Sequence, residues 1–297
     1  MRRATLWVVI ASILIALAML AALRVSADAP SLGSLALFAA AALLASAIFG
    51  PSTKLARLGD CFGAQGLVAL AGFAGGVISL MGLGLHFPVA DTALMAADRA
   101  LGLDGAMLAR RVAQAPGSIQ QVIGASYTST LGVLLVSLAV LAFLGERLEV
   151  WRAAFCFAAS LLTVCLISIL MPAQGLGIWL SDDVLAGLPD GAAIYALPTF
   201  AHFYAGKPSI VRLESIDAVV CFPSFHIIMG LIIVTLWRRR ITTLLVSMAF
   251  FAAMAIGTVP FGGHYFIDLI GGTIVWAGWF AIAGWLPNPR SVVIAGQ

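Results

Sequence analysis

Charged residues are scarce in this chain: of its 297 residues only 10% are Asp, Glu, Lys or Arg, whereas 62% are hydrophobic. A soluble domain usually carries about 25% charged residues, so this chain has too few charges to cover a water-exposed surface. The mean hydropathy is +1.08. The net charge is only +3, and the basic residues form short clusters between apolar runs, which disfavours a nucleic-acid-binding surface. Composition therefore predicts a membrane protein that binds no nucleic acid.

Cysteine is also rare, with four residues at Cys61, Cys156, Cys165 and Cys221. Cys156 and Cys165 lie on one expected helix, about 13 Å apart along its axis, which is too far for a disulfide. None of the four has the spacing of a familiar zinc motif. Cysteine usage therefore says little about the redox compartment.

Long apolar segments, in contrast, recur along the chain. Each is long enough, or nearly so, to cross a hydrocarbon layer of about 30 Å as a helix. They are continuously apolar and rich in Ala, Leu and Gly, whereas membrane strands alternate. We predict an all-α, polytopic membrane protein with about eight transmembrane helices, at roughly 6–25, 32–49, 64–86, 124–145, 153–171, 218–237, 241–260 and 265–286.

The Lys and Arg residues favour a cytoplasmic N-terminus. Ten of them then face the cytoplasm and six the other side, and the run Arg238–Arg240 contributes most to this difference. The first segment is longer than the roughly 7–15 apolar residues of a signal peptide, so we interpret it as a membrane anchor. This orientation predicts a multi-pass protein of the inner (plasma) membrane.

Two long loops, 87–118 and 172–217, then lie outside. The first mixes Asp and Arg with Ala, Leu and Met, which predicts short amphipathic helices at the membrane surface. The second combines Pro, Gly and acidic residues with aromatic ones. Packing at the interface and a lid or substrate-entry surface are both open interpretations of these loops.

Few ionisable groups lie within the apolar segments. His226 lies near the outer end of the sixth segment, and His264 and Asp268 lie at the outer end of the eighth. An ionisable group inside a membrane costs about 2.5–3.5 kcal/mol on insertion scales, so it indicates a functional site. The assigned orientation places all three residues at the same face of the membrane.

The spacing of these residues suggests a division of labour. Asp268 follows His264 by four residues, which places both on one face of a helix, so that the carboxylate can orient the imidazole. A histidine held in this way can attack phosphorus, and His226 is then the candidate general acid. Ser224 can donate a hydrogen bond to a phosphoryl oxygen, and the backbone near Gly263 can approach an anion closely.

These stretches resemble the second and third signature motifs of the type 2 phosphatidic acid phosphatase (PAP2) superfamily. Its Pro-Ser-x-His corresponds to Pro223–His226, and its His-x-x-x-Asp corresponds to His264 and Asp268. The resemblance covers roughly 64–286 and is greatest to the branch grouped with inositol phosphorylceramide synthases. It implies a six-helix core in which the later histidine is the nucleophile, the aspartate supports it and the earlier histidine is acid and base.

The resemblance also implies an activity and a substrate class. We expect a phosphatase or headgroup transferase that acts on a lipid phosphate or phospholipid, with its active site facing the periplasm or cell exterior. Because histidines carry the covalent and proton-transfer steps, no metal or cofactor is expected. The lipid and the acceptor, water or an alcohol, do not follow from the sequence. The predicted parts are an N-terminal hairpin (1–63), the catalytic domain (64–286) and a short cytoplasmic tail (287–297).

The chain departs from the superfamily pattern at the first signature motif. That motif supplies a Lys and an Arg to the phosphate, but the corresponding stretch here, Pro172–Gly175, contains neither. The Ser-Arg pair that normally precedes the nucleophile corresponds to Gly257 and Thr258. Lys207 and Arg212 are the remaining candidates for neutralising the phosphate, and anchoring to lipid headgroups is their alternative role.

Three other hypotheses remain open. A proton-coupled transporter could use the same His and Asp residues as a relay. A zinc site at His226, His264 and Asp268 has suitable ligand types but no familiar spacing. The chain could also be a catalytically inactive descendant of an enzyme. A cysteine phosphatase based on Cys221 is disfavoured, because its Cys-x5-Arg motif would need an Arg where Ile227 stands.

Overall fold

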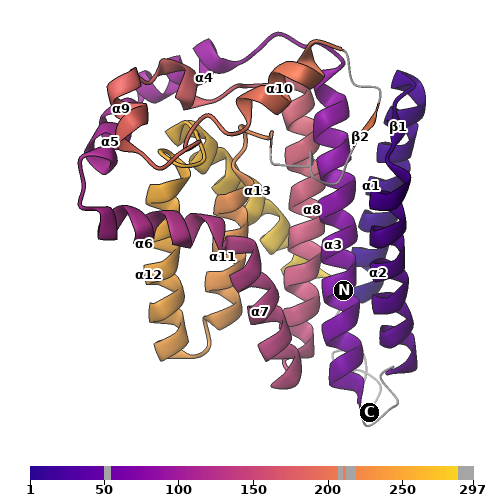
Figure 1. The fold of residues 1–297 in the computed structure, drawn as a ribbon. Helices are drawn as coiled ribbons and strands as arrows, with labels where there is room; N and C mark the ends of the chain where they lie inside the picture. The colour runs from indigo at the N-terminus through magenta and orange to yellow at the C-terminus, as the bar shows by residue number, and fades with distance from the viewer. Residues whose placement is uncertain (50–54, 207–209, 212–218, 287–297) are drawn as a thin grey trace.

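The computed structural model describes residues 1–49, 55–206, 210–211 and 219–286. Long helices stand side by side as a bundle (Figure 1). They are α1 (Arg2–Leu23), α2 (Ala29–Ile48), α3 (Ala56–Leu83), α7 (Thr130–Phe143), α8 (Arg147–Leu170), α11 (Phe225–Trp237), α12 (Ile241–Thr258) and α13 (Phe266–Trp285).

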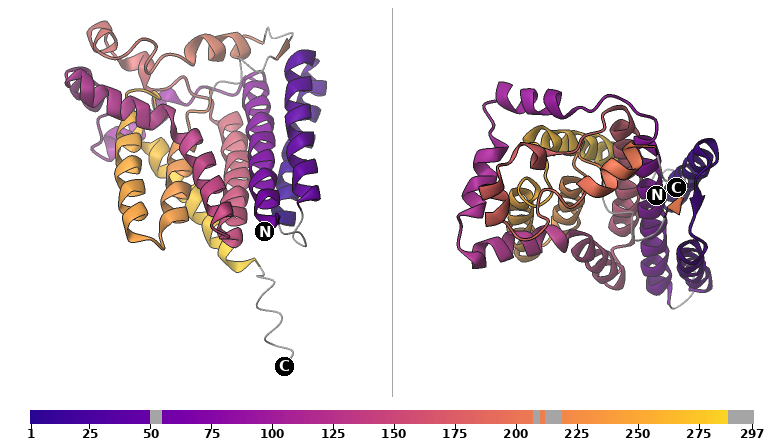
Figure 2. Two further views of the ribbon diagram at one scale, coloured as in Figure 1. Left: turned by 60° about the horizontal axis from the view of Figure 1, so that its bottom comes forward. Right: turned by 45° about the horizontal axis from the view of Figure 1, so that its top comes forward.

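A layer of short helices covers one end of this bundle (Figures 1 and 2). We call it the cap layer; it consists of α4 (Asp91–Ala100), α5 (Gly105–Ala113), the turn η1 (Leu176–Trp179), α9 (Asp182–Gly187) and α10 (Leu197–Tyr204). Its elements come from the two long loops of the sequence, and α4 and α5 correspond to the short helices expected in the first of them. The two loops therefore meet above the same end of the bundle.

Five of the described helices, α1, α3, α8, α12 and α13, are long and apolar enough to cross a membrane. The bent pair formed by α6 (Gly117–Thr128) and α7 makes a sixth if it counts as one span, and α11 and residues 37–48 of α2 are shorter apolar helices. The prediction of an all-α, polytopic membrane protein is confirmed.

The fourth predicted segment, 124–145, is not one straight helix. The chain turns by 58° between α6 and α7, so that α6 lies across the bundle end beneath the cap layer. Hydroxyl groups cluster at this turn, and those of Thr128, Ser129 and Thr130 all donate to carbonyls three or four residues earlier. Such bonds compete with the helical ladder and bend helices, and they account for the break.

The sixth predicted segment, 218–237, is helical only from Phe225 onward. The described residues before it form a loop that ends at Ser224, the residue that precedes the helix. Pro223 lacks the N–H needed inside a helix, and helices rarely include the residue before a proline, which explains the late start. The loop enters the bundle end directly below the cap layer.

The centre of the bundle is the contact between α3 and α8. At Gly75 an added Cβ would lie 2.8 Å from the Leu161 side chain, so a glycine is needed for this close approach. The Cys165 thiol donates to the Gly75 carbonyl over 3.2 Å. Lipid tails are as apolar as helix side chains, so the hydrophobic effect does not drive membrane helices together. Their association relies on close van der Waals packing, which small residues such as glycine permit.

The bundle end opposite the cap layer carries a cluster of ion pairs. Buried Glu149 lies 3.0 Å from Arg238 and 3.3 Å from Arg239, and Glu146 lies 3.4 Å from Arg240. These pairs join the start of α8 to the turn between α11 and α12. The described basic residues predicted to face the cytoplasm therefore gather at the end away from the cap layer.

The N-terminal hairpin of α1 and α2 packs along α3 at one edge of the bundle (Figure 2). Between these two helices, strand β1 (Ser26–Ala27) pairs in parallel with strand β2 (Ile210–Val211). The Asp28 amide also donates to the Val211 carbonyl over 2.9 Å. The hairpin is therefore hydrogen-bonded to the segment that follows α10.

Candidate active site

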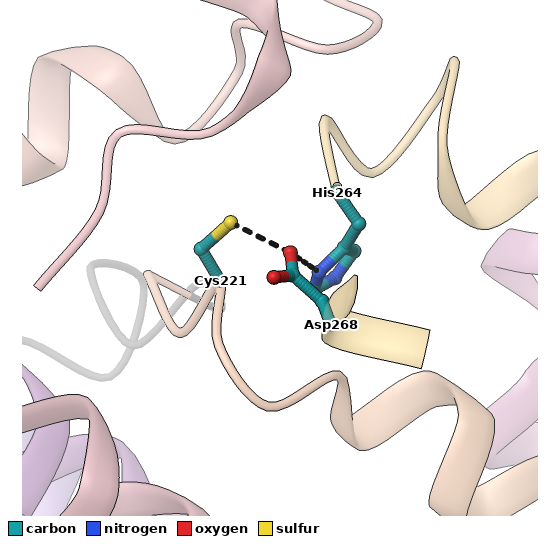
Figure 3. Close-up of side chains that lie close together, drawn as sticks. All are labelled: Cys221, His264 and Asp268. Atoms are coloured by element: carbon teal, nitrogen blue, oxygen red, sulfur yellow. Dashed lines mark hydrogen bonds and ion pairs between the residues drawn. The ribbon is translucent and has the colours of Figure 1, made fainter. Parts of the chain in front are cut away.

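His264 lies just before α13 and Asp268 lies in the first turn of this helix, and their side chains are in contact (Figure 3). The His264 Nδ1 atom lies 3.1 Å from the Asp268 Oδ2 atom, and both side chains are buried. The sequence predicted this contact from the spacing of two residues on one helix. His264 in fact precedes α13, and Asp268 reaches back toward it from the third position of the helix. The contact thus arises from a helix cap and not from a shared helix face.

Asp268 is tied to its surroundings through several further bonds. Its Oδ2 atom accepts a hydrogen bond from the Tyr265 amide over 2.9 Å and one from the Cys221 thiol over 3.0 Å. Its carbonyl accepts a bond from the Ser224 amide over 2.9 Å, which joins the start of α11 to α13. Oδ1 is buried and has no hydrogen-bond partner among the described residues.

Ser224 and His226 begin α11 beside this pair. The Ser224 side chain is fully buried, does not cap the helix, and its hydroxyl has no partner in the described part of the chain. The His226 ring is stacked on Tyr127, with 4.1 Å between centroids and 24° between planes. A Cβ added to Gly262 would lie 2.6 Å from the Tyr127 hydroxyl oxygen and 2.9 Å from His264 Cδ2. Gly262 therefore lies close to both His264 and Tyr127, the residue on which His226 is stacked.

A pocket of about 870 Å³ opens beside His226. Its lining comes from α6, from residues 187–195 and from Phe261. The polar side chains that line it include Gln121, Tyr195 and Asp190, and none of its described lining residues is Lys or Arg. The pocket therefore offers neutral hydrogen-bonding groups and one carboxylate beside the predicted acid.

Two buried aspartates of α4 hold the surrounding backbone. Asp98 accepts hydrogen bonds from the Phe266 and Ile267 amides over 2.8 and 2.7 Å, so it caps the N-terminus of α13 from another helix. Asp91 accepts bonds from the Gln174 and Gly175 amides over 3.0 and 2.8 Å. Each carboxylate thus uses both of its oxygens to fix a loop beside the site.

Tyr265 joins these two loops. Its hydroxyl donates to Asp91 Oδ1 over 2.9 Å and accepts from Trp179 Nε1 over 2.7 Å. Burial, and then the nearby Asp91 carboxylate, raise the pKa of the Tyr265 phenol, so it keeps its proton and can act as this donor. The residue between His264 and α13 is therefore anchored to the cap layer.

The backbone segments that contain Gly175 and Gly263 pass very close to each other. Gly175 has φ +95° and Gly263 has φ +70°, and a Cβ at Gly175 would lie 2.5 Å from the Gly263 carbonyl oxygen. The Gly263 carbonyl accepts a bond from the Leu176 amide over 2.6 Å, and its own amide donates to Val259 over 3.1 Å. Both backbone groups of Gly263 are thus engaged, and its predicted role in anion binding stays a prediction.

The structure brings together most of the predicted site residues. His264, Asp268, Ser224, His226 and Gly263 lie at one end of the bundle, below the cap layer. The predicted phosphate-neutralising residues, Lys207 and Arg212, lie outside the described residues. The stretch Pro172–Gly175, which resembles the first family motif, does lie against the loop of His264, although it contributes no cation.

Sequence reasoning missed the supporting residues of the site. Asp91 and Asp98 belong to the loop that was expected to form surface helices, yet both are almost fully buried. Their separation of seven residues puts them on one face of α4 together with Leu94, and this was the available signal. Cys221 and Tyr127 gave no such signal, because their partners lie far away in the sequence.

Fold and site together define a helical membrane protein with a buried His–Asp pair at one end of its bundle. The family model of the PAP2 superfamily matches residues 92–282, which run from α4 into α13 and include Ser224, His226, His264 and Asp268. Since this is well over half of the chain, the protein belongs to the PAP2 superfamily. Comparison with curated proteins and with solved structures yields no match.

Proposed function

We propose that this protein is an integral membrane phosphatase or phosphotransferase that acts on a phosphorylated lipid through a phospho-histidine at His264. Membership of the PAP2 superfamily suggests phosphatase-type chemistry. The observation that carries the proposal is the 3.1 Å contact between His264 Nδ1 and Asp268 Oδ2. An Nδ1–H that donates to the carboxylate leaves the lone pair of Nε2 for attack on phosphorus.

The first half-reaction forms a bond between Nε2 and phosphorus and breaks the bond from phosphorus to the leaving alkoxide. His226 donates a proton to that alkoxide, which becomes a free alcohol or diacylglycerol-like product. In the second half-reaction His226 takes a proton from the acceptor, whose oxygen attacks phosphorus and displaces His264. Water as acceptor gives a phosphatase, and an alcohol gives a headgroup transferase.

The surroundings of His226 support its role as acid and base. The ring is stacked on Tyr127, which limits its orientation, and it borders the 870 Å³ pocket through which an acceptor can approach. The unpartnered Ser224 hydroxyl, two residues earlier, is available to a phosphoryl oxygen. Residues at the N-terminus of α11 are suited to an anion because helix amides there point outward.

We assign the site to the non-cytoplasmic face of the inner (plasma) membrane. The support is the separation of charges along the bundle. The ion-pair cluster with Arg238, Arg239 and Arg240 lies at the end opposite the cap layer. Basic residues accumulate on the cytoplasmic side of membrane proteins, so the cap layer and the site belong on the other side.

The charge of the pocket bears on the substrate class. The described lining residues include the carboxylate of Asp190 and no Lys or Arg. A phosphomonoester carries nearly two negative charges and a diester only one. In a pocket that has no cation among its described lining residues, binding of the diester therefore has the smaller electrostatic cost. We therefore assign a diester or bulky headgroup as the preferred substrate, as in the branch grouped with inositol phosphorylceramide synthases.

Trapping of the covalent intermediate tests the proposed function. Purified protein is incubated briefly with a lipid phosphate labelled at phosphorus, then denatured and mapped by mass spectrometry. We expect a label on His264 that is labile to acid and stable to base. The His264→Ala variant should carry no label, while His202→Ala, which alters an exposed histidine of the cap layer, should label like the wild type.

The alternative hypotheses give different results in the same set of experiments. A proton-coupled transporter would show no label and would move solute into liposomes in proportion to a pH gradient. A zinc-dependent enzyme would lose turnover to a chelator and regain it with zinc. Either result contradicts the phospho-histidine mechanism.

Turnover on matched substrates tests the substrate class. A phosphomonoester and a phosphodiester of equal acyl-chain length are compared by thin-layer chromatography, with and without a polyol acceptor. We expect higher turnover on the diester. A clear preference for the monoester, with inorganic phosphate as the only product, would contradict this assignment and indicate a phosphatase that hydrolyses phosphomonoesters.

A further inference from the structure

We propose that Cys221, His264 and Asp268 form a binding site for a soft divalent cation such as Zn²⁺ or Cd²⁺, and that an ion bound there blocks His264. This site differs from a zinc site at the two histidines, because a thiol takes the place of His226. Metal binding stands on the geometry alone. The inhibitory effect rests on the proposed function of His264.

The three side chains already have the spacing of a metal site (Figure 3). Their ligand atoms all lie within 4.8 Å of one another, and the described residues contain no other group of three such ligands. Bonds of about 2.0–2.3 Å to sulfur, nitrogen and oxygen put the ligands of a tetrahedral zinc ion about 3–4 Å apart. The thiol lies 3.0 Å and the imidazole nitrogen 3.1 Å from Asp268 Oδ2, so small shifts suffice.

A second observation points to a ligand at this place. Asp268 Oδ1 is fully buried and has no partner among the described residues, although a buried carboxylate oxygen normally accepts a hydrogen bond. A cation held by both oxygens of this carboxylate would satisfy it. All three side chains are buried, with exposed fractions of 8% for Cys221, 4% for His264 and 0% for Asp268.

The chemistry of binding disables the nucleophile. The cation displaces the proton of the Cys221 thiol, which is released to solvent, and bonds to the resulting thiolate. It also takes the lone pair of His264 Nδ1, so the ring proton moves from Nδ1 to Nε2. Nε2 then has no lone pair with which to attack phosphorus. No oxidant or further reactant is needed, and removal of the cation restores the original state.

Cadmium alone, added to the purified full-length protein in detergent, is the probe for this site. A cadmium–thiolate bond gives an ultraviolet charge-transfer band that does not depend on enzyme activity. We expect the band in the wild type and in a variant whose only cysteine is Cys221, with Cys61, Cys156 and Cys165 changed to Ala. The Cys221→Ala and Cys221→Ser variants should lack it, and the Asp268→Asn variant should bind cadmium about tenfold more weakly or worse.

Turnover measured in parallel tests the inhibitory effect. Cadmium or zinc should inhibit the wild type and the variant that retains Cys221, and a chelator should reverse the inhibition. In Cys221→Ser, relative to its own metal-free activity, the half-inhibitory concentration should rise about tenfold or more. The two cysteine substitutions check each other, because serine keeps the hydrogen bond to Asp268 that alanine removes.

The outcomes separate the two proposals. A band that persists without Cys221, or that is absent in the variant that retains only Cys221, overturns the metal site whatever the enzyme does. A band without any phospho-histidine label supports the metal site and contradicts the proposed function. Activity that requires added zinc overturns the inhibitory effect.

Discussion

The Asp98 carboxylate in α4 accepts a 2.8 Å hydrogen bond from the Phe266 amide at the start of α13, although the two residues are 168 positions apart. Its other oxygen accepts the next amide, that of Ile267. The free amides and the positive dipole end of a helix are its usual means of binding an anion. At α13 a carboxylate of the protein already occupies this position. Under the proposed function we therefore expect the phosphate at the start of α11 instead.

The first prediction concerns this cap. Asp98→Ala leaves two amides at the start of α13 without an acceptor and should lower the free energy of unfolding by about 2 kcal/mol. It should also lower turnover, because Asp268 lies in the same turn. Asp98→Asn, whose single carbonyl oxygen can satisfy only one amide, should fall between. Thermal unfolding in detergent and turnover on a lipid phosphate measure the two effects.

The matched control is Asp104→Ala. Asp104 caps α5 through a 2.8 Å bond from the Met107 amide, whereas the amides at the start of α13 donate to Asp98. It should lower stability by about 1 kcal/mol and leave turnover near the wild-type value. Equal losses of turnover in the two alanine variants would mean that Asp98 acts only through global stability.

The second prediction concerns the catalytic groups. His264→Ala should abolish turnover, since it removes the nucleophile. Asp268→Asn should retain a fraction of it, because the ring is less well oriented but still present. His226→Ala should lose about 10²–10⁴-fold on a substrate with an alkoxide leaving group and much less on one with a good leaving group such as nitrophenol. Normal turnover in His264→Ala would contradict the mechanism.

The third prediction concerns Tyr127, whose ring is stacked on His226. Tyr127→Ala removes the stack and should lower turnover about tenfold or more with an alkoxide leaving group, as part of the loss of acid catalysis. With a nitrophenyl leaving group the loss should be small. Tyr127→Phe keeps the ring but removes the 3.3 Å contact with the Tyr195 hydroxyl, and it should stay close to the wild type. A loss that does not depend on the leaving group would indicate a purely structural role.

The fourth prediction concerns orientation in the membrane. The native cysteines Cys61, Cys156, Cys165 and Cys221 are all buried, so added cysteines can be labelled selectively. Cysteines introduced at the exposed positions Arg110 and Asp182 should react with an impermeant thiol reagent in intact cells. Those at Arg57 and Arg239 should react only after lysis. The reverse pattern would put the site on the cytoplasmic side.

The general architecture could be predicted from the sequence because it depends on the average hydropathy of segments about 20 residues long. Continuous apolar runs predict membrane helices whatever their neighbours are, and the described helices match these runs in order. The bend at Ser129 escaped prediction, because the segment is apolar on average and only a short run of hydroxyl-bearing residues, 126–130, marks the break. The late start of α11 was marked by Pro223, but the apolar residues before it outweighed this signal.

The site could be predicted only where its residues are close in sequence or carry a family motif. His264 and Asp268 are four residues apart, whereas Cys221 lies 47 residues from the Asp268 oxygen that it contacts. Asp91 reaches Tyr265 across 174 residues. Contacts of this kind depend on how the helices pack, and a single sequence contains no record of that packing. The supporting residues of the site therefore became visible only in three dimensions.

The short pairing between β1 and β2 bears on how the chain can be divided. The family match begins at residue 92, so the helices α1 and α2 look like a detachable addition. Yet the backbone of Ser26 and Ala27 is paired with Ile210 and Val211, inside the matched region. A truncated chain would expose a strand edge that water or another molecule must then satisfy. Engineering of a minimal version of this protein should therefore treat the hairpin as part of the scaffold and replace that edge if the hairpin is removed.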